Sequence, residues 1–127
     1  MRKSQPDDPF SQFTPAMFHI LLVLTAHECH GYGIMQEVAA QTAGGMRLGP
    51  GTLYRSIKQL VSAGLIAESE ERPDPVLDDE RRRYYRITER GQQAARREAE
   101  RLEQVVRIAR TRRLLQGEGR AVPIRAE

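Results

Sequence analysis

Near the end of an apolar segment, four adjacent residues have side chains that can bind metals or undergo redox chemistry. They are His27, Glu28, Cys29 and His30. Imidazole, thiolate and carboxylate are the usual zinc ligands, but a site needs three or four of them to converge on one ion. These four residues span a helix end and the turn after it, where we expect side chains to fan outward. The sequence therefore predicts no metal site, and it predicts an inert Cys29 thiol rather than a redox sensor.

The sequence offers no catalytic constellation either. It contains no glycine-rich phosphate loop, no nucleophile elbow and no paired carboxylates in an apolar setting. We therefore expect a protein that is not an enzyme and that needs no cofactor.

A second group of residues whose side chains could contact a ligand follows Pro50, on a predicted helix that ends before Gly64. Apolar residues recur there at the helical period and predict a core-facing stripe: Leu53, Ile57, Leu60 and Val61. The opposite face carries small, polar and basic residues: Gly51, Thr52, Arg55, Lys58, Gln59 and Ser62. Guanidinium, amide and hydroxyl groups on an exposed helix are those that read base edges in the major groove of DNA.

The sequence also predicts the helices and strands that would position the polar face of this helix. Apolar periodicity predicts a first helix from Thr14-Pro15 to about His27 and a second over roughly residues 32–42. A very short strand is expected at Met46-Arg47-Leu48. Two longer strands, at 65–70 and 83–88, enclose an exposed loop over 71–82. Three helices and a β-hairpin in this order are typical of a winged helix-turn-helix. The hairpin cations expected at phosphates are Arg81, Arg82 and Arg83.

A last, long helix is predicted from Glu89 to about Gln116, with Thr88 as its N-cap. Small and apolar residues follow a heptad-like seam along it: Ala95, Ala99, Leu102, Val105, Val106 and Ala109. The other faces are charged. We expect two copies of the chain to bury this seam, so that the protein is a homodimer.

These predictions divide the chain into four parts. They are a flexible arm (residues 1–13), a winged helix-turn-helix domain (14–88), a dimerisation helix (89–116) and a flexible tail (117–127). The predicted fold class is mainly α with a small β-hairpin.

Composition agrees with a small folded protein. The chain has 127 residues, of which 39% are hydrophobic and 29% charged, and its net charge of +3 permits but does not prove nucleic-acid binding. A single cysteine favours the reducing cytoplasm. We read no membrane-spanning segment and no export signal.

Several motifs in these elements resemble the PadR-type transcriptional regulators. They are His30-Gly31-Tyr32-Gly33-Ile34, Gly51-Thr52-Leu53-Tyr54 and Arg83-Tyr84-Tyr85-Arg86-Ile87-Thr88-x-x-Gly91. The resemblance spans about residues 14–115, with one C-terminal helix as in the short-tailed branch of the family. It implies a homodimeric repressor. Tyr32 and Tyr54, which lie within these motifs, are also expected at DNA, and we expect Tyr54 to pack at the helix flank with its hydroxyl near a phosphate rather than to stack on a base.

The expected partner is double-stranded operator DNA. A two-fold dimer would read an inverted repeat. Many members of the family respond to small molecules, so an apolar or aromatic effector is a candidate second partner, expected among apolar side chains of the first and last helices. The alternative left open is a winged-helix protein-interaction module or anti-regulator that does not bind DNA.

Overall fold

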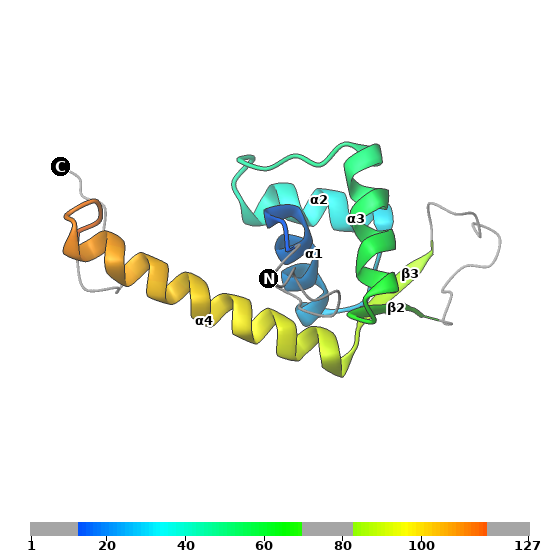
Figure 1. Ribbon diagram of the computed structural model, residues 1–127. Coiled ribbons are helices and arrows are strands. Elements are labelled where there is room, and N and C mark those ends of the chain that lie inside the picture. The colour runs from blue at the N-terminus through cyan, green and yellow to red at the C-terminus, as the bar shows by residue number, and fades with distance from the viewer. Residues whose placement is uncertain (1–12, 70–82, 117–127) are drawn as a thin grey trace. The chain divides into compact units, whose positions relative to one another are not determined.

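The computed structural model describes residues 13–69 and 83–116 (Figure 1). Its elements, in chain order, are α1 (Pro15–Ala26), β1 (Cys29–His30), α2 (Gly31–Gln41), α3 (Pro50–Ser62), β2 (Ile66–Glu68), β3 (Tyr84–Ile87) and α4 (Glu89–Thr111). This is the mainly helical winged architecture that the sequence predicts. The expected N-terminal arm apart from Phe13, the C-terminal tail and the whole loop 71–82, with Arg81 and Arg82, lie outside the described residues.

Helix α1 begins as its sequence dictates. The Thr14 hydroxyl accepts a hydrogen bond from the Met17 amide at 3.1 Å, and Pro15 occupies the first helical position. The helix is apolar on most sides and buries five side chains: Met17, Ile20, Leu21, Val23 and Leu24. It packs against α2, α3 and β3, and it forms the centre of the core (Figure 1).

A small antiparallel sheet flanks these helices, with strand order β1-β3-β2. Its first strand is Cys29–His30, which pairs with Tyr85 and Tyr84 of β3. The strand expected at residues 46–48 is wrong, because that segment has no regular secondary structure and follows the turn at residues 42–44. The Thr42 hydroxyl accepts a hydrogen bond from the Met46 amide at 3.0 Å there.

Helix α3 runs over the predicted residues and closes with the predicted cap. Gly64 takes a positive φ of 78°, and the Leu65 amide donates to the Leu60 carbonyl at 3.0 Å. The core-facing stripe differs in one position from the prediction. Val61 is 43% exposed, whereas Ser56 is buried at 5%. A residue directly after Leu60 lies about 100° around the helix from it, which turns Val61 away from the core.

Helix α4 begins at the predicted cap and ends earlier than predicted. The Thr88 hydroxyl accepts a hydrogen bond from the Gly91 amide at 3.0 Å. At the other end, Arg113 takes a positive φ of 65° and the Leu114 amide donates to the Ala109 carbonyl at 3.0 Å. This turn stops the helix at Thr111, before Gln116, where we expected it to end.

The chain divides into two compact units, and the division lies inside α4. The first unit is Met1–Arg96 and the second is Arg97–Glu127. The domain boundary that the sequence places at residue 88 stays a prediction. Ala94 and Ala95, in the second turn of α4, are buried in the core of the first unit. No helix among the described residues is long and apolar enough to span a membrane.

Candidate nucleic-acid interface

The polar face of α3 is presented to solvent. Its exposed residues include those expected to read DNA: Gly51, Thr52, Arg55, Lys58 and Gln59. The buried stripe behind them, Leu53, Ser56, Ile57 and Leu60, fixes the rotation of the helix about its axis. A rigid helix with one face locked in a core and the other in water is what base-edge contacts require.

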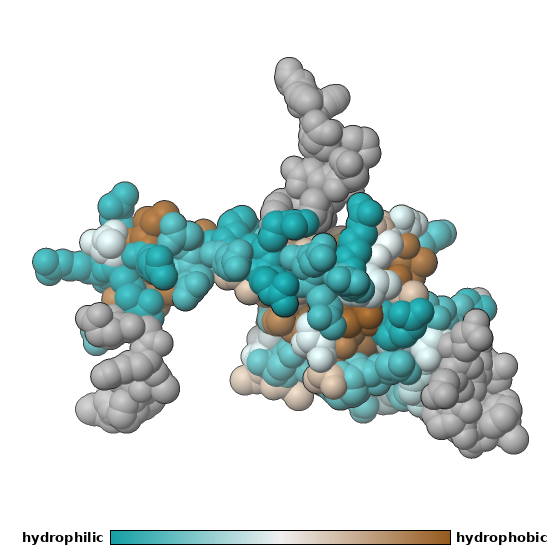
Figure 2. Space-filling model, turned by 90° about the horizontal axis from the view of Figure 1, so that it is seen from below, coloured by the Kyte–Doolittle hydropathy of each residue, from teal (hydrophilic) through white to brown (hydrophobic). Residues whose placement is uncertain are grey.

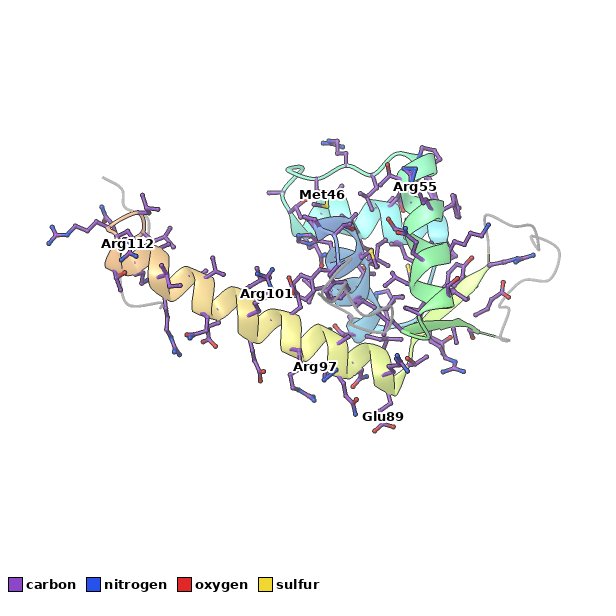
Figure 3. All side chains as sticks on the ribbon, in the orientation of Figure 1. Met46, Arg55, Glu89, Arg97, Arg101 and Arg112 are labelled. Atoms are coloured by element: carbon purple, nitrogen blue, oxygen red, sulfur yellow. The ribbon has the colours of Figure 1, made fainter. Side chains whose placement is uncertain are left out.

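Arg55 lies in the first half of α3 on this exposed face (Figure 3). Its guanidinium Nη2 is 3.5 Å from the Thr52 hydroxyl oxygen, at the limit of hydrogen bonding. The contact is therefore weak, and the side chain can exchange it for an acceptor on another molecule. The N-cap of α3 is Gly49, which has no side chain to cap the amides at the start of the helix.

The two tyrosines predicted at DNA occupy different environments. Tyr32 is 53% exposed on α2. Tyr54 is half-buried, and its hydroxyl stands against the α2 backbone at Gly31, where an added Cβ would lie 2.7 Å from the hydroxyl oxygen. Tyr54 therefore packs between α3 and the start of α2, and a side chain at position 31 would fit only if the tyrosine hydroxyl shifted.

A groove of about 550 Å³ runs beside α3 and the strands. It is lined by Tyr54, Ile57, Lys58, Val61, Glu68, Arg83 and Tyr85. Arg83, the residue before β3, forms an ion pair with Glu68 of β2, with 3.1 Å between its Nε and Glu68 Oε2. Both side chains are about half exposed, so the pair stabilises the fold little and a phosphate could compete for the guanidinium. Lys58 of α3 and Arg83 of the hairpin thus border one surface.

The motif residues that prompted the family resemblance mostly hold the first unit together. The His30 Nδ1 accepts a hydrogen bond from the Gly33 amide at 2.9 Å and so caps α2. Its ring meets Tyr84 edge-on, with 5.2 Å between the ring centroids. Tyr85, which alternates with Tyr84 along β3, is buried in the core. His30 therefore has a structural role, as the cap of α2.

Thr88 and Gly91 connect the end of α3 to the start of α4. The Thr88 amide donates to the Leu65 carbonyl at 3.0 Å, and its hydroxyl lies 2.7 Å from the Gly64 carbonyl oxygen. Gly91 is buried against the same Leu65 carbonyl, where an added Cβ would approach to 2.0 Å. The close backbone contact thus requires glycine at the last position of the Thr-x-x-Gly motif.

Cys29 is 6% exposed in the core. Burial, with a smaller contribution from the negative charge of Glu37, raises the pKa of its thiol to about 11. Such a thiol is protonated and slow to react, as the sequence predicts. The expectation that the four side chains of the His27–His30 run fan outward is wrong for His27 and Cys29, however, because these two converge with Glu37 of α2. Sequence reasoning missed Glu37, since it lies seven residues beyond the His27–His30 run.

The residues predicted at a dimer interface divide between the two units. Ala95 is buried in the core of the first unit. The others lie in the second unit and are exposed or partly exposed: Ala99, Leu102, Val105, Val106 and Ala109. Val105 is 47% exposed and the nearby Ile108 is 54% exposed. Figure 2 shows hydrophobic surface among hydrophilic side chains toward the C-terminal end of α4.

Comparisons with known proteins agree with this geometry. Residues 20–97 match the model of the transcriptional regulator PadR-like family. The transcriptional regulator Rv3488 of Mycobacterium tuberculosis is 37% identical over 89 residues, which cover 70% of this chain and 77% of that protein.

Two of the solved structures that share this fold illustrate the similarity. A transcriptional regulator from Clostridium thermocellum has a TM-score of 0.64 at 24% identity, covering 76% of this chain and 87% of its own. A PadR family regulator from Clostridium difficile has a TM-score of 0.63 at 20% identity, covering 77% and 97%. With the family model matched over most of the winged domain, the chain belongs to the PadR-like family of transcriptional regulators.

Proposed function

We propose that this regulator is a repressor that binds operator DNA as a homodimer, with α3 of each subunit in the major groove. The observation that carries the proposal is the two-sided character of α3. Its inner stripe is buried in the core, and its outer face offers a guanidinium, an ammonium and an amide to solvent. In this role Arg55 would bond two acceptors of one guanine, the commonest specific contact to a base edge.

The hairpin supplies phosphate contacts in this proposal. Arg83 and Lys58 border the groove beside α3, and the predicted contacts Arg81 and Arg82 directly precede Arg83 in the sequence. Contacts of this kind release counterions from DNA and carry little sequence information. They would set the affinity, whereas α3 would set the preference among sequences.

The proposed dimer forms through α4. The exposed apolar residues Val105 and Ile108 lie three positions apart, so they share one helix face. A symmetric dimer presents two copies of α3, and its operator would be an inverted repeat with half-sites about 10 base pairs apart, centre to centre. The proposal also includes a small apolar or aromatic effector that weakens DNA binding. Such a molecule could bind to exposed apolar side chains like those of α4.

The test is fluorescence anisotropy of the purified protein with the DNA that flanks its own gene. We expect binding that unlabelled random DNA displaces only in large excess, and a footprint with two-fold symmetry. The alternative, a winged-helix module that binds proteins and not DNA, predicts no preference for that fragment at any salt concentration. Equal affinity for the two DNAs would therefore contradict the proposal.

A further inference from the structure

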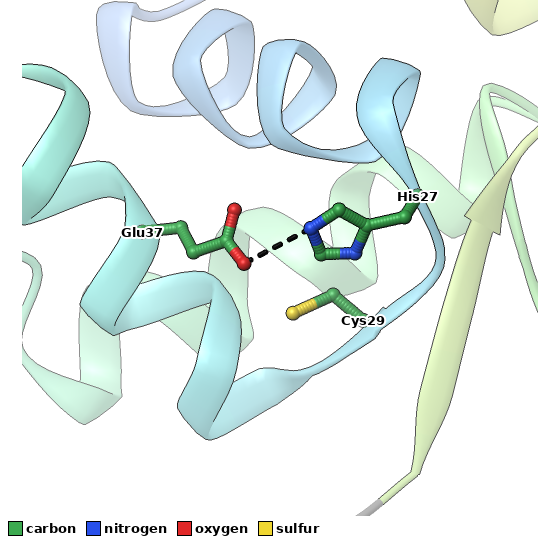
Figure 4. A group of neighbouring side chains, drawn as sticks. All are labelled: His27, Cys29 and Glu37. Atoms are coloured by element: carbon green, nitrogen blue, oxygen red, sulfur yellow. Dashed lines mark ion pairs between the residues drawn. The ribbon is translucent and has the colours of Figure 1, made fainter.

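Three side chains from two elements meet beside the start of α2. They are His27, after the end of α1, Cys29 of β1 and Glu37 of α2 (Figure 4). One donor atom from each, an imidazole nitrogen, the thiol sulfur and a carboxylate oxygen, lies within 4.8 Å of the others. All three residues belong to the first unit. This site is separate from the proposed DNA-reading residues of α3.

The backbone explains why these side chains converge. His27 leaves α1 in an extended conformation, with φ −172° and ψ 163°, so the chain turns back along α2. Cys29 lies against α2 at Gly33, where an added Cβ would come within 2.7 Å of the sulfur. Glu37 follows Gly33 by four residues and is therefore on the same face of the helix.

The hydrogen bonds of His27 constrain its protonation. Its Nδ1 is 2.7 Å from the Glu28 backbone oxygen, which can only accept, so Nδ1 carries the proton. Its Nε2 lies 3.0 Å from Glu37 Oε2. In a neutral ring this nitrogen is also an acceptor, so the close approach of the two atoms requires a cation between them. That cation is either a proton on Nε2 or a metal ion.

A histidine whose Nδ1–H donates to a backbone carbonyl, as in His27, is common at metal sites. A metal-binding histidine usually donates its other ring N–H to a backbone carbonyl, which fixes the ring and leaves the second nitrogen for the ion. The two other candidates in the His27–His30 run are engaged elsewhere. The Glu28 carboxylate accepts a hydrogen bond from the Ser69 hydroxyl at 3.0 Å, and the His30 Nδ1 caps α2.

We propose that His27, Cys29 and Glu37 form a binding site for a divalent transition-metal ion of the zinc type. One nitrogen, one sulfur and one oxygen donor suit such a borderline ion, whereas calcium and magnesium prefer oxygen alone. A thiolate and a carboxylate with a neutral imidazole balance the 2+ charge. Binding displaces the thiol proton to solvent, as is usual for cysteine ligands.

The geometry leaves room for entry of the ion and for a fourth ligand. The side chains of His27 and Glu37 are 51% and 43% exposed, so the ion can arrive from solvent and water can complete a tetrahedron. Donor atoms around a tetrahedral zinc ion lie roughly 3.3–3.8 Å apart, given Zn–N and Zn–S bonds of about 2.0–2.3 Å. The His27 Nε2–Glu37 Oε2 distance of 3.0 Å is already close to this range, and donor atoms as far as 4.8 Å apart would have to move closer on binding.

The proposal is testable with Co²⁺ as a spectroscopic probe of the untagged, chelator-treated full-length chain. Cys29 is the one cysteine in the sequence, so any thiolate-to-Co²⁺ charge-transfer band reports on it. We expect this band at one ion per chain, with the strong visible bands of tetrahedral Co²⁺ and with release of the ion when Zn²⁺ is added. We also expect a rise in melting temperature with Zn²⁺.

The variants His27→Gln and Glu37→Gln alter exposed ligands and should fold normally. Each should weaken Zn²⁺ binding by more than the roughly 10- to 100-fold that loss of an outer-shell partner causes. Cys29→Ser should abolish the charge-transfer band. His19→Gln, which changes a histidine outside the cluster, should bind as the wild type does. Absence of the band in the wild-type chain, or unchanged Zn²⁺ affinity in His27→Gln and Glu37→Gln, would overturn the proposal.

Discussion

Gly91 occupies a position where no side chain fits, and this makes it a sharp test of the packing between α3 and α4. A Cβ there would approach the Leu65 carbonyl oxygen to 2.0 Å, and backbone cannot move aside as a flexible side chain can. Gly91→Ala should lower the free energy of unfolding by at least the roughly 1–3 kcal/mol that overpacking usually costs. Urea denaturation followed by circular dichroism measures this.

Gly51 provides the matched control. A Cβ on Gly51 would meet nothing within 4 Å, and the residue lies in the first turn of α3. Gly51→Ala should leave stability unchanged or raise it by up to about 1 kcal/mol through helix propensity. If Gly91→Ala and Gly51→Ala proved equally stable, the close contact at Leu65 would be wrong.

Local chemistry at single residues could be predicted from the sequence, but convergence in space could not. Thr14 and Thr88 cap their helices as expected, because a cap depends on residues within four positions. Glu37 could not be associated with His27, since their contact depends on the turn between α1 and α2. The same applies to Tyr54 and Gly31, whose contact joins two helices.

At the scale of an element, the two faces of α3 should respond differently to truncation. Leu60 is fully buried and Val61, the next residue, is 43% exposed. Leu60→Ala removes buried methyl groups and leaves a cavity, which typically costs about 2–5 kcal/mol. Val61→Ala should cost less than about 0.5 kcal/mol, as is usual for surface positions. Both are measured by denaturant unfolding, and comparable losses would show that α3 is rotated from the orientation described.

The sequence did not predict one very short strand, and it misplaced the end of one helix because a backbone conformation sets that end. Strand β1 has two residues and exists only because β3, more than fifty residues later, pairs with it. No periodicity can reveal a segment of that length. Helix α4 stops at Thr111 because Arg113 adopts a left-handed conformation, which arginine rarely does. The long helices were predictable because burial imposes their period over several turns.

At the scale of the whole molecule, the proposed dimer should depend on the apolar residues of the second unit. The double variant Val105→Glu and Ile108→Glu places charges on the proposed interface. It should sediment as a monomer at micromolar concentration and bind the operator far more weakly, since one reading helix replaces two.

The control variant adds the same two charges at exposed positions in the first unit. Gln92→Glu with Gln93→Glu should remain a dimer, because both side chains point to solvent. Sedimentation velocity of all three proteins decides the question. A wild-type chain that is monomeric at this concentration would contradict dimerisation through α4.

The measurement that tests the central claim most directly compares Arg55→Ala with Arg97→Ala in affinity for operator and for random DNA at several salt concentrations. Both variants remove one exposed arginine from a helix, but only Arg55 lies on the polar face of α3 (Figure 3).

If Arg55 reads a base, its loss should cost about 1–3 kcal/mol of discrimination. Operator affinity should then fall far more than random-DNA affinity, whereas Arg97→Ala should leave the gap between the two DNAs unchanged. A phosphate contact would instead weaken both DNAs equally and reduce the salt slope by about one. If Arg55→Ala lowered both affinities by the same factor, the outer face of α3 would not be the surface that reads DNA.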